Sequence, residues 1–232
     1  RKLSTFIDVG ANVGYFSMLA ELYFESDTKI IAIEPFPRNI EFIKKLKKLN
    51  GFQFELIEKA VANENGKQIL YYPFHKSSSK LAMTGSLVNV FLGTDSKFKD
   101  IPYKTVNVDT ITLEDACAST RNATLIKLDC EGNELPILRS SPSILNREDV
   151  DFIIEVLVGD KNKHEIFKLM KEYNYRGFLI THGGLIDEDR PLTLSNPNNK
   201  SRTLWRNHFF TKKSKSEVQQ FSNKCYGISS LH

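Results

Sequence analysis

The sequence predicts an α/β fold in which helices cover both faces of a mostly parallel β-sheet. Short apolar runs of strand length alternate with segments of helical periodicity from residue 6 to residue 61, which is a βαβαβ pattern. Two glycines interrupt the chain directly after the first apolar run, where such folds turn from strand to helix. At 232 residues, without an internal repeat or a domain boundary, the chain has the size of one domain that can bury a core.

The first part of the chain supplies the βαβαβ unit. One face of its first helix is apolar and comprises Phe16, Leu19, Ala20 and Tyr23. The second helix has a proline in its first turn and ends at Asn50-Gly51. The predicted elements are strand 6–9, helix 15–24, strand 29–33, helix 37–49 and strand 52–61, followed by a hairpin turn at 63–66 into strand 67–74.

The remainder of the chain is expected to complete the sheet. Residues 75–100 lose periodicity and are rich in Ser and Thr, and so long a loop in a compact domain is usually functional or disordered. We expect residues 1–211 to form one domain. The later predicted elements are strand 103–108, capped helix 110–115, strand 123–128, helix 134–138 with Asn133 as its N-cap, strand 151–158, helix 161–173, strands 175–181 and 203–211 with a turn at 181–184, and a polar tail at 212–232.

The glycine turn is expected to bind a ligand. Gly10 and Gly14 carry no side chain that would block approach to backbone amides at a helix N-terminus. Asp8 lies at the end of the first strand, and Glu34 ends the second one, where a ribose-binding acid belongs. Because Asn12 stands where closure on a pyrophosphate needs glycine, a ligand without phosphates fits better. S-adenosylmethionine offers a ribose diol to Glu34 and an ammonium to Asp8; a helix cap is the alternative role for Asn12.

A second set of acids follows a later apolar strand. Ligands of doubly wound sheets bind outside the carboxyl ends of the strands, so Asp129 and Glu131 are expected to face the same crevice as the glycine turn. Asp129 is the first choice for a general base or an anchor of a substrate hydroxyl. Glu131 and Glu155 are expected to hold neighbouring hydroxyls or a metal, whereas capping of the following helix is the alternative for Asp129 and Glu131. His75 and His182, in loops, are alternative bases, weighed against surface or structural roles.

Composition excludes several partners and locations. No stretch approaches the ~18 apolar residues of a membrane span. The net charge is +4, and the lysines of helix 37–49 lie opposite its apolar residues, which favours a solvated face over a nucleic-acid patch. Cys117, Cys130 and Cys225 lack metal-binding spacing, which indicates a reducing, cytoplasmic location. The chain opens with Arg1 and no signal peptide, so we expect it to be cut from a longer protein with a further segment or domain upstream.

Several motifs occur in a characteristic order. They are Asp8-Val-Gly-Ala-Asn-Val-Gly14, Ala32-Ile-Glu-Pro35, Ala60-Val-Ala62, the serines at 77–79, Val108-Asp-Thr-Ile111 and Ile126-Lys-Leu-Asp-Cys-Glu-Gly-Asn-Glu-Leu135. With this ordered set, over roughly residues 4–158, the chain resembles the FkbM family of S-adenosylmethionine-dependent methyltransferases. The late Arg206-Asn-His-Phe-Phe210 also looks like the closing strand of that family.

The resemblance implies a class I, Rossmann-like methyltransferase fold, with a seven-stranded sheet whose late strands form an antiparallel hairpin. It also implies O-methylation of hydroxyl groups, often on sugars or natural products, and leaves the acceptor and any metal requirement open. By position it assigns to the cofactor Asp8, Gly10, Asn12 and Gly14 at the methionyl end, Glu34 at the ribose, and Ala62 or Asn63 at the adenine edge.

The leading functional expectation is methyl transfer to a hydroxyl of a sugar in a glycan or glycolipid. In this hypothesis Ser78, in the polar loop 75–100, and Glu155 contact the acceptor. The alternatives are methylation of a small natural product or of RNA ribose, and a non-catalytic methyltransferase-like binding module. RNA would require a basic crevice and binding that weakens steeply with salt.

Overall fold

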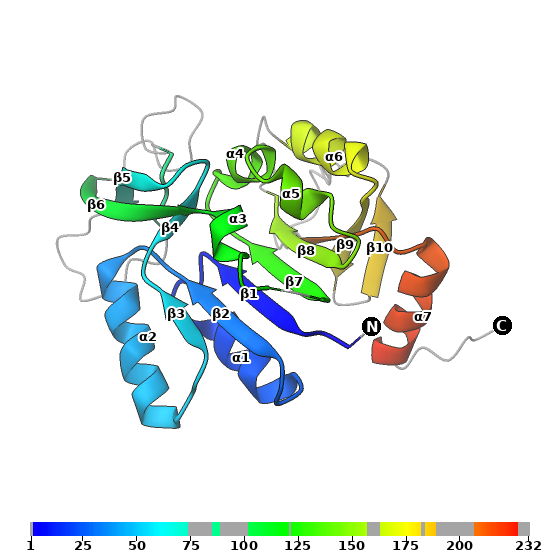
Figure 1. Cartoon of the computed structure of the whole chain (residues 1–232), viewed down its shortest axis with the longest axis horizontal. Helices are drawn as coiled ribbons and strands as arrows, with labels where there is room; N and C mark the ends of the chain where they lie inside the picture. The colour runs from blue at the N-terminus through cyan, green and yellow to red at the C-terminus, as the bar shows by residue number, and fades with distance from the viewer. Residues whose placement is uncertain are drawn as a thin grey trace, which may run out of the picture.

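The computed structural model of the chain describes residues 2–73, 85–88, 102–120, 122–156, 163–181, 184–188 and 207–226. An eight-stranded sheet forms its centre, and a three-stranded sheet lies beside it (Figure 1). The strands are β1 (Thr5–Val9), β2 (Lys29–Ile33), β3 (Glu55–Ile57), β4 (Ala60–Ala62), β5 (Gly66–Pro73), β6 (Tyr103–Thr112), β7 (Thr124–Leu128), β8 (Val150–Glu155), β9 (Arg176–Thr181), β10 (Gly184–Glu188) and β11 (Asn207–Thr211). The helices are α1 (Tyr15–Tyr23), α2 (Pro37–Asn50), α3 (Leu113–Ala116), α4 (Glu134–Arg139), α5 (Pro142–Leu145), α6 (Lys163–Glu172) and α7 (Lys215–Tyr226).

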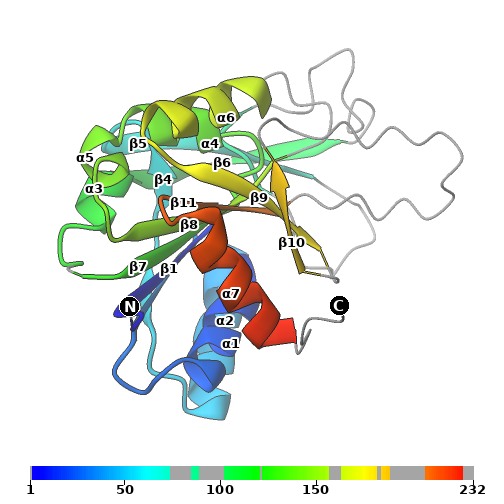
Figure 2. The ribbon, with the colours of Figure 1, turned by 90° about the vertical axis from the view of Figure 1, so that its right-hand side faces the viewer.

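The large sheet confirms the predicted fold class. Its strand order is β10-β9-β11-β8-β7-β1-β2-β3. The strands from β8 to β3 are parallel, whereas β11 runs antiparallel to both β8 and β9. Helices α1, α2 and α7 lie on one side of the sheet and α3 to α6 on the other (Figure 2). Seven of its strands lie in segments predicted as strands, whereas β10, at the edge beside β9, was not predicted. The strands predicted at 67–74 and 103–108 lie in the small sheet as β5 and β6.

The packing of the core explains why the central strands are continuous apolar runs in the sequence. All five residues of β1 are buried, because helices cover both faces of a parallel sheet. On the side of α3 to α6, the fully buried side chains of Ile7, Ile126 and Phe152 lie in one apolar cluster. On the side of α1 and α2, Phe6 and Ile43 belong to a second, smaller cluster.

The buried face of α1 differs from the predicted one. Ala20 is buried as expected, but Phe16 is 45% and Tyr23 81% exposed. Ser17 is buried instead, and its hydroxyl donates a hydrogen bond to the Asp8 carboxylate at 2.7 Å. The apolar periodicity missed this because a buried polar bond, and not hydrophobic burial alone, sets the rotation of the helix.

The region between the glycine turn and the later strands was partly mispredicted. The single strand expected at 52–61 is two short strands, β3 in the large sheet and β4 in the small one. The hairpin expected at 63–66 is wrong, because β6 lies between β4 and β5. An antiparallel ladder from Gly66↔Thr110 to Pro73↔Tyr103 joins β5 to β6, and local turn residues cannot reveal a pairing so distant in sequence.

The helix termini combine confirmed and unexpected features. The capped helix predicted at 110–115 begins later, because β6 continues to Thr112, whose hydroxyl caps α3 by accepting a hydrogen bond from the Asp115 amide. Residues 212–232, expected as a polar tail, contain α7, which buries Val218 and lies against β10. No helix in the described ranges is long and apolar enough to cross a membrane.

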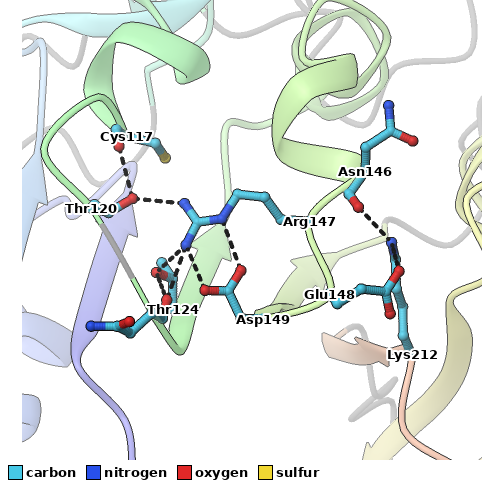
Figure 3. Close-up of polar contacts among 9 residues, drawn as sticks. Cys117, Thr120, Thr124, Asn146, Arg147, Glu148, Asp149 and Lys212 are labelled. Carbon is cyan, nitrogen blue, oxygen red and sulfur yellow. Dashed lines mark hydrogen bonds and ion pairs between the residues drawn. The ribbon is translucent and has the colours of Figure 1, made fainter.

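Arg147 fastens the amino ends of β7 and β8 (Figure 3). Its guanidinium donates to both carboxylate oxygens of Asp149, at 2.9 and 3.1 Å. It also donates to the hydroxyls of Thr120 and Thr124 and to the carbonyl of Asn122. One planar side chain therefore ties the segment before β8 to the loop that precedes β7, which a single-point cation such as lysine cannot do.

We predict that Arg147→Ala lowers the free energy of unfolding by about 2–4 kcal/mol, because several partly buried acceptors lose a charge-assisted donor. Arg147→Lys should recover less than half of this loss. The matched control is Arg139→Ala, which removes a single exposed pair with Glu165 and should cost under about 1 kcal/mol. Urea unfolding of the three variants measures these differences, and equal losses for Arg147→Ala and Arg139→Ala would contradict the prediction.

Candidate active site

The glycine turn after β1 lies directly against the end of β7. Gly10 has a φ of 76°, in the left-handed region, and its amide donates to the Ile33 carbonyl at 3.0 Å. A Cβ placed on Gly10 would lie 2.0 Å from the Asp129 carbonyl oxygen. Only glycine permits both the backbone conformation and this approach. Gly14, with a φ of 80°, is the N-cap of α1, which assigns that position to it and not to Asn12.

Glu34 closes the turn from the side of β2. Its carboxylate accepts hydrogen bonds from the amides of Asn12 at 2.8 Å and Phe36 at 2.9 Å, and from the side chain of Asn39 at 3.2 Å. Burial raises the pKa of Glu34 to about 7, although the three donors favour its ionised form. The acid expected to hold a ribose is therefore built into the wall of the turn.

A cleft opens between the glycine turn, the small sheet and the end of β7. Gly10, Asn12, Glu34, Asp129 and Glu131 line it, so the structure brings five of the predicted site residues together. Its apolar wall comprises Ile33, Ala60, Val61, Leu70 and Leu87. The cleft has a volume of about 100 Å³, below the roughly 300–1,000 Å³ of small-molecule sites, so a ligand of nucleoside size requires its walls to move apart.

Three carboxylates converge beside this cleft. Asp129 follows β7, Glu155 ends the adjacent strand β8, and Glu131 lies in the loop before α4, with a φ of 51°. One carboxylate oxygen of each lies within 4.8 Å of those of the other two, and all three residues are half-buried. Ser86 fixes the loop by donating its hydroxyl to the Glu131 carbonyl at 2.8 Å. Such a group can accept hydrogen bonds from neighbouring hydroxyls or bind a divalent cation.

Asp8 does not reach the cleft. It is fully buried, accepts the Ser17 hydroxyl, and is absent from the cleft lining. Burial raises the pKa of Asp8, and the Lys127 ammonium, 3.9 Å away, opposes that rise. The expectation that Asp8 contacts an ammonium of the ligand is thus not supported by its placement, because its carboxylate turns to the α1 side of the sheet.

Three other positions assigned to the cofactor also lie outside the cleft lining. Gly14 packs against Ile43 behind the turn, Ala62 is buried in β4, and Asn63 is exposed. The neighbouring Ala60 and Val61 line the cleft instead. His75, Ser78 and His182 lie outside the described residues, so their roles stay predictions.

Sequence reasoning missed two charged residues of the site. Lys127 is 4% exposed, and its ammonium lies 2.8 Å from Asp129 Oδ2. Asn133 is the N-cap of α4 as predicted, but its side chain makes no capping hydrogen bond. Glu134 instead accepts hydrogen bonds from the loop amides of Cys130 at 2.6 Å and Gly132 at 3.0 Å. A lysine inside an apolar strand was the available signal for Lys127, because a buried charge needs a partner.

The strand order, the glycine turn and the acids at the carboxyl ends of β2, β7 and β8 define a class I methyltransferase fold. The FkbM methyltransferase domain profile matches residues 8–176 of the sequence. The chain therefore belongs to the FkbM methyltransferase family, a family of enzymes whose methyl donor is S-adenosylmethionine.

One solved structure is similar to this chain in fold. A methyltransferase FkbM from Methylobacillus flagellatus KT aligns with 90% of this chain, at 12% identity and a TM-score of 0.51. The alignment covers 43% of that protein, so the chain spans less than half its length. Precorrin-6y C5,15-methyltransferase from Geobacter metallireducens and ribosomal protein L11 methylase from Lactobacillus delbrueckii subsp. bulgaricus each align with 90% of this chain at 12% identity and a TM-score of 0.43, covering 79% and 69% of those chains. No protein of curated function matches the sequence.

We predict that Gly10→Ala disrupts the site far more than Gly51→Ala. Both residues have a φ of 76°, so an added Cβ strains both backbones by about 1–2 kcal/mol. The Cβ at Gly51 meets nothing within 4 Å, whereas that at Gly10 collides with the Asp129 carbonyl. Thermal unfolding should show a loss for Gly10→Ala at least about twice that for Gly51→Ala. Equal losses would show that the close approach contributes nothing.

The pH dependence of stability should reveal Glu34 and Glu134. Burial raises the folded-state pKa of each to about 7, whereas the ordinary value is 4.5. The folded protein retains a proton on each group between these values, so stability falls as pH rises from 4.5 to 7, by up to roughly 3 kcal/mol per group.

Thermal unfolding between pH 5 and 8 tests this dependence. Glu134→Gln should flatten the profile, while Glu41→Gln, on an exposed position of α2, should keep the wild-type slope. If the stability of Glu134→Gln falls with pH as steeply as that of the wild type, the pKa of Glu134 is not raised in the folded protein.

Proposed function

We propose that the chain transfers a methyl group from S-adenosylmethionine to a hydroxyl of a sugar in a glycan or glycoconjugate. The observation that carries this proposal is the convergence of Asp129, Glu131 and Glu155 beside the glycine turn. Carboxylates are acceptors for hydroxyl donors, and a sugar presents neighbouring hydroxyls at a spacing that several acids can bind together.

The cleft has features that suit the cofactor. Gly10 lines the cleft and lets the turn approach the Asp129 carbonyl closely, and Glu34 places a buried carboxylate in the wall next to the Asn12 amide. We assign Glu34 to the ribose hydroxyls and the apolar Val61 and Leu87 to the base. When bound, S-adenosylmethionine supplies an activated methyl group on its sulfonium. Asp8 then supports the turn from behind and does not contact the ligand.

Asp129 is the proposed general base. An alcohol is a poor nucleophile while protonated, and a positioned base adds about 10²–10⁴-fold to the rate. Asp129 would accept the proton of the attacking hydroxyl, while Glu131 and Glu155 hold the hydroxyls beside it. Holding the acceptor in line with the methyl group supplies much of the remaining acceleration. Ser78 remains a predicted acceptor contact.

The same three carboxylates also suit a divalent cation that orients the acceptor hydroxyls. Methyl transfer measured with and without a chelator decides between direct hydrogen bonding and a metal. An RNA acceptor is disfavoured, because the described lining of the cleft contains three acids and neither lysine nor arginine.

The decisive experiment is transfer of labelled methyl from S-adenosylmethionine to a panel of glycans, polyketides and RNA, followed by mapping of the labelled atom. Label on a sugar oxygen is the expected result. Label on a carbon or nitrogen would overturn the proposal. Isothermal titration with S-adenosylmethionine is the companion measurement, and absence of binding would favour a non-catalytic module.

We predict that Glu34→Ala weakens S-adenosylmethionine binding about ten- to a hundredfold, the scale of a charge-assisted hydrogen bond of ~1.5–3 kcal/mol. Titration calorimetry measures this change, with the exposed Glu41→Ala as the control. Unchanged affinity would remove Glu34 from the ribose site.

Asp129→Asn should leave cofactor affinity within about threefold of the wild type while lowering methyl transfer at least about a hundredfold, since the amide cannot accept the proton. Calorimetry and labelled transfer on the same preparation separate the two effects. Full activity would exclude Asp129 as the base.

A further inference from the structure

We infer that Lys127 is a positioning residue that fixes the Asp129 carboxylate and connects it to Asp8 behind the glycine turn. The inference rests on the proposed function, because it concerns the group assigned there as the base. Lys127 itself is not among the residues that line the cleft, and we do not expect it to touch the cofactor or the acceptor.

The register of the sheet brings the three charges together. Asp8 and Lys127 are partners in the parallel pairing of β1 with β7, and Asp129 follows Lys127 by two residues. Side chains two apart in an extended strand point to the same face. The Lys127 ammonium accordingly lies 2.8 Å from Asp129 Oδ2 and 3.9 Å from Asp8 Oδ1.

The three side chains differ in how deeply they are buried. The side chains of Lys127 and Asp8 are 5% and 0% exposed, whereas that of Asp129 is 28% exposed. The ring of Phe16 covers the ammonium at 4.8 Å. Of the three side chains, only that of Asp129 is open to solvent. Lys127 holds Asp129 through Oδ2, which leaves Oδ1 for a ligand.

Fold stability alone does not account for Lys127. Replacing a buried ion pair by neutral groups is often neutral or stabilising, whereas removing one partner leaves an uncompensated buried charge. A pair kept only for stability gains little over an apolar pair in this strand. A Lys127–Asp8 pair that also fixes the Asp129 carboxylate contributes to catalysis, because a misplacement of about 1 Å at the reacting groups can lower the rate a hundredfold.

The experiment compares variants that separate positioning from folding. Lys127→Met removes the ammonium, and Lys127→Met with Asp8→Asn removes both buried charges, which keeps the fold testable should the single variant not fold. Lys127→Arg retains the charge. Lys47→Met is the matched control, since Lys47 also lies over a phenylalanine ring, that of Phe54, at 4.4 Å on the distant helix α2.

In labelled methyl transfer, we expect Lys127→Met, or its double variant with Asp8→Asn, to lower kcat about a hundredfold, with cofactor affinity and acceptor KM within about threefold. Lys127→Arg should restore part of the rate, and Lys47→Met should change nothing. Adding Asp129→Asn should cause no further loss, because Lys127 acts through Asp129. Additive losses, or a normal kcat, would overturn the inference.

A crystal structure of the double variant tests the inference without the need for an acceptor. In crystals of the neutral double variant, the Asp129 carboxylate should move by about 1 Å or more, or become disordered, relative to the wild type. An unchanged carboxylate would refute positioning by Lys127. If the wild type neither binds S-adenosylmethionine nor transfers methyl, the proposed function fails, and this crystal structure still decides whether Lys127 places Asp129.

Discussion

The contact between Gly10 and the Asp129 carbonyl is the constraint on which the site depends. Because no Cβ intervenes, the turn after β1 packs against the end of β7. The Asp129 amide also donates to the Val9 carbonyl at 3.2 Å. The two central strands therefore end at one point, and the residues that follow each of them share one cleft. A side chain at Gly10 would push the turn away from the end of β7. The wall that contains Glu34 would then no longer share a cleft with Asp129.

The site divides its acids by environment. Glu34 is enclosed by three donors in the wall of the turn, where we propose that it binds the ribose hydroxyls. Asp129 and its neighbours are half-buried at the mouth, where an acceptor can reach them. Asp8 is the most deeply buried acid and serves the scaffold through Ser17 and Lys127. Glu34, Asp129 and Asp8 follow or belong to neighbouring strands, but each has a different environment and therefore a different role.

The sequence predicted the parts of the fold that depend on local periodicity. The βαβαβ unit, Glu34 and Asp129 follow from apolar runs and from the residues that end them, whereas the reversed late strand was expected from the family resemblance. The β5–β6 pairing did not, because its partners lie on either side of a long aperiodic segment. The orientation of Asp8 was also beyond reach, since an acid in a strand buried on both faces gives no sign of which face it takes. Lys127 was detectable only as a charge in an apolar run.

A crystal structure with S-adenosylhomocysteine bound would test whether the glycine turn and the acids after β7 form one site. We expect the ribose hydroxyls within hydrogen-bond distance of the Glu34 carboxylate, and the sulfur on the side of the cleft that Asp129 lines. We also expect the walls near Leu87 to move apart to admit the ligand. A ligand bound away from Glu34, or with Asp129 separated from the sulfur by the sheet, would contradict this expectation.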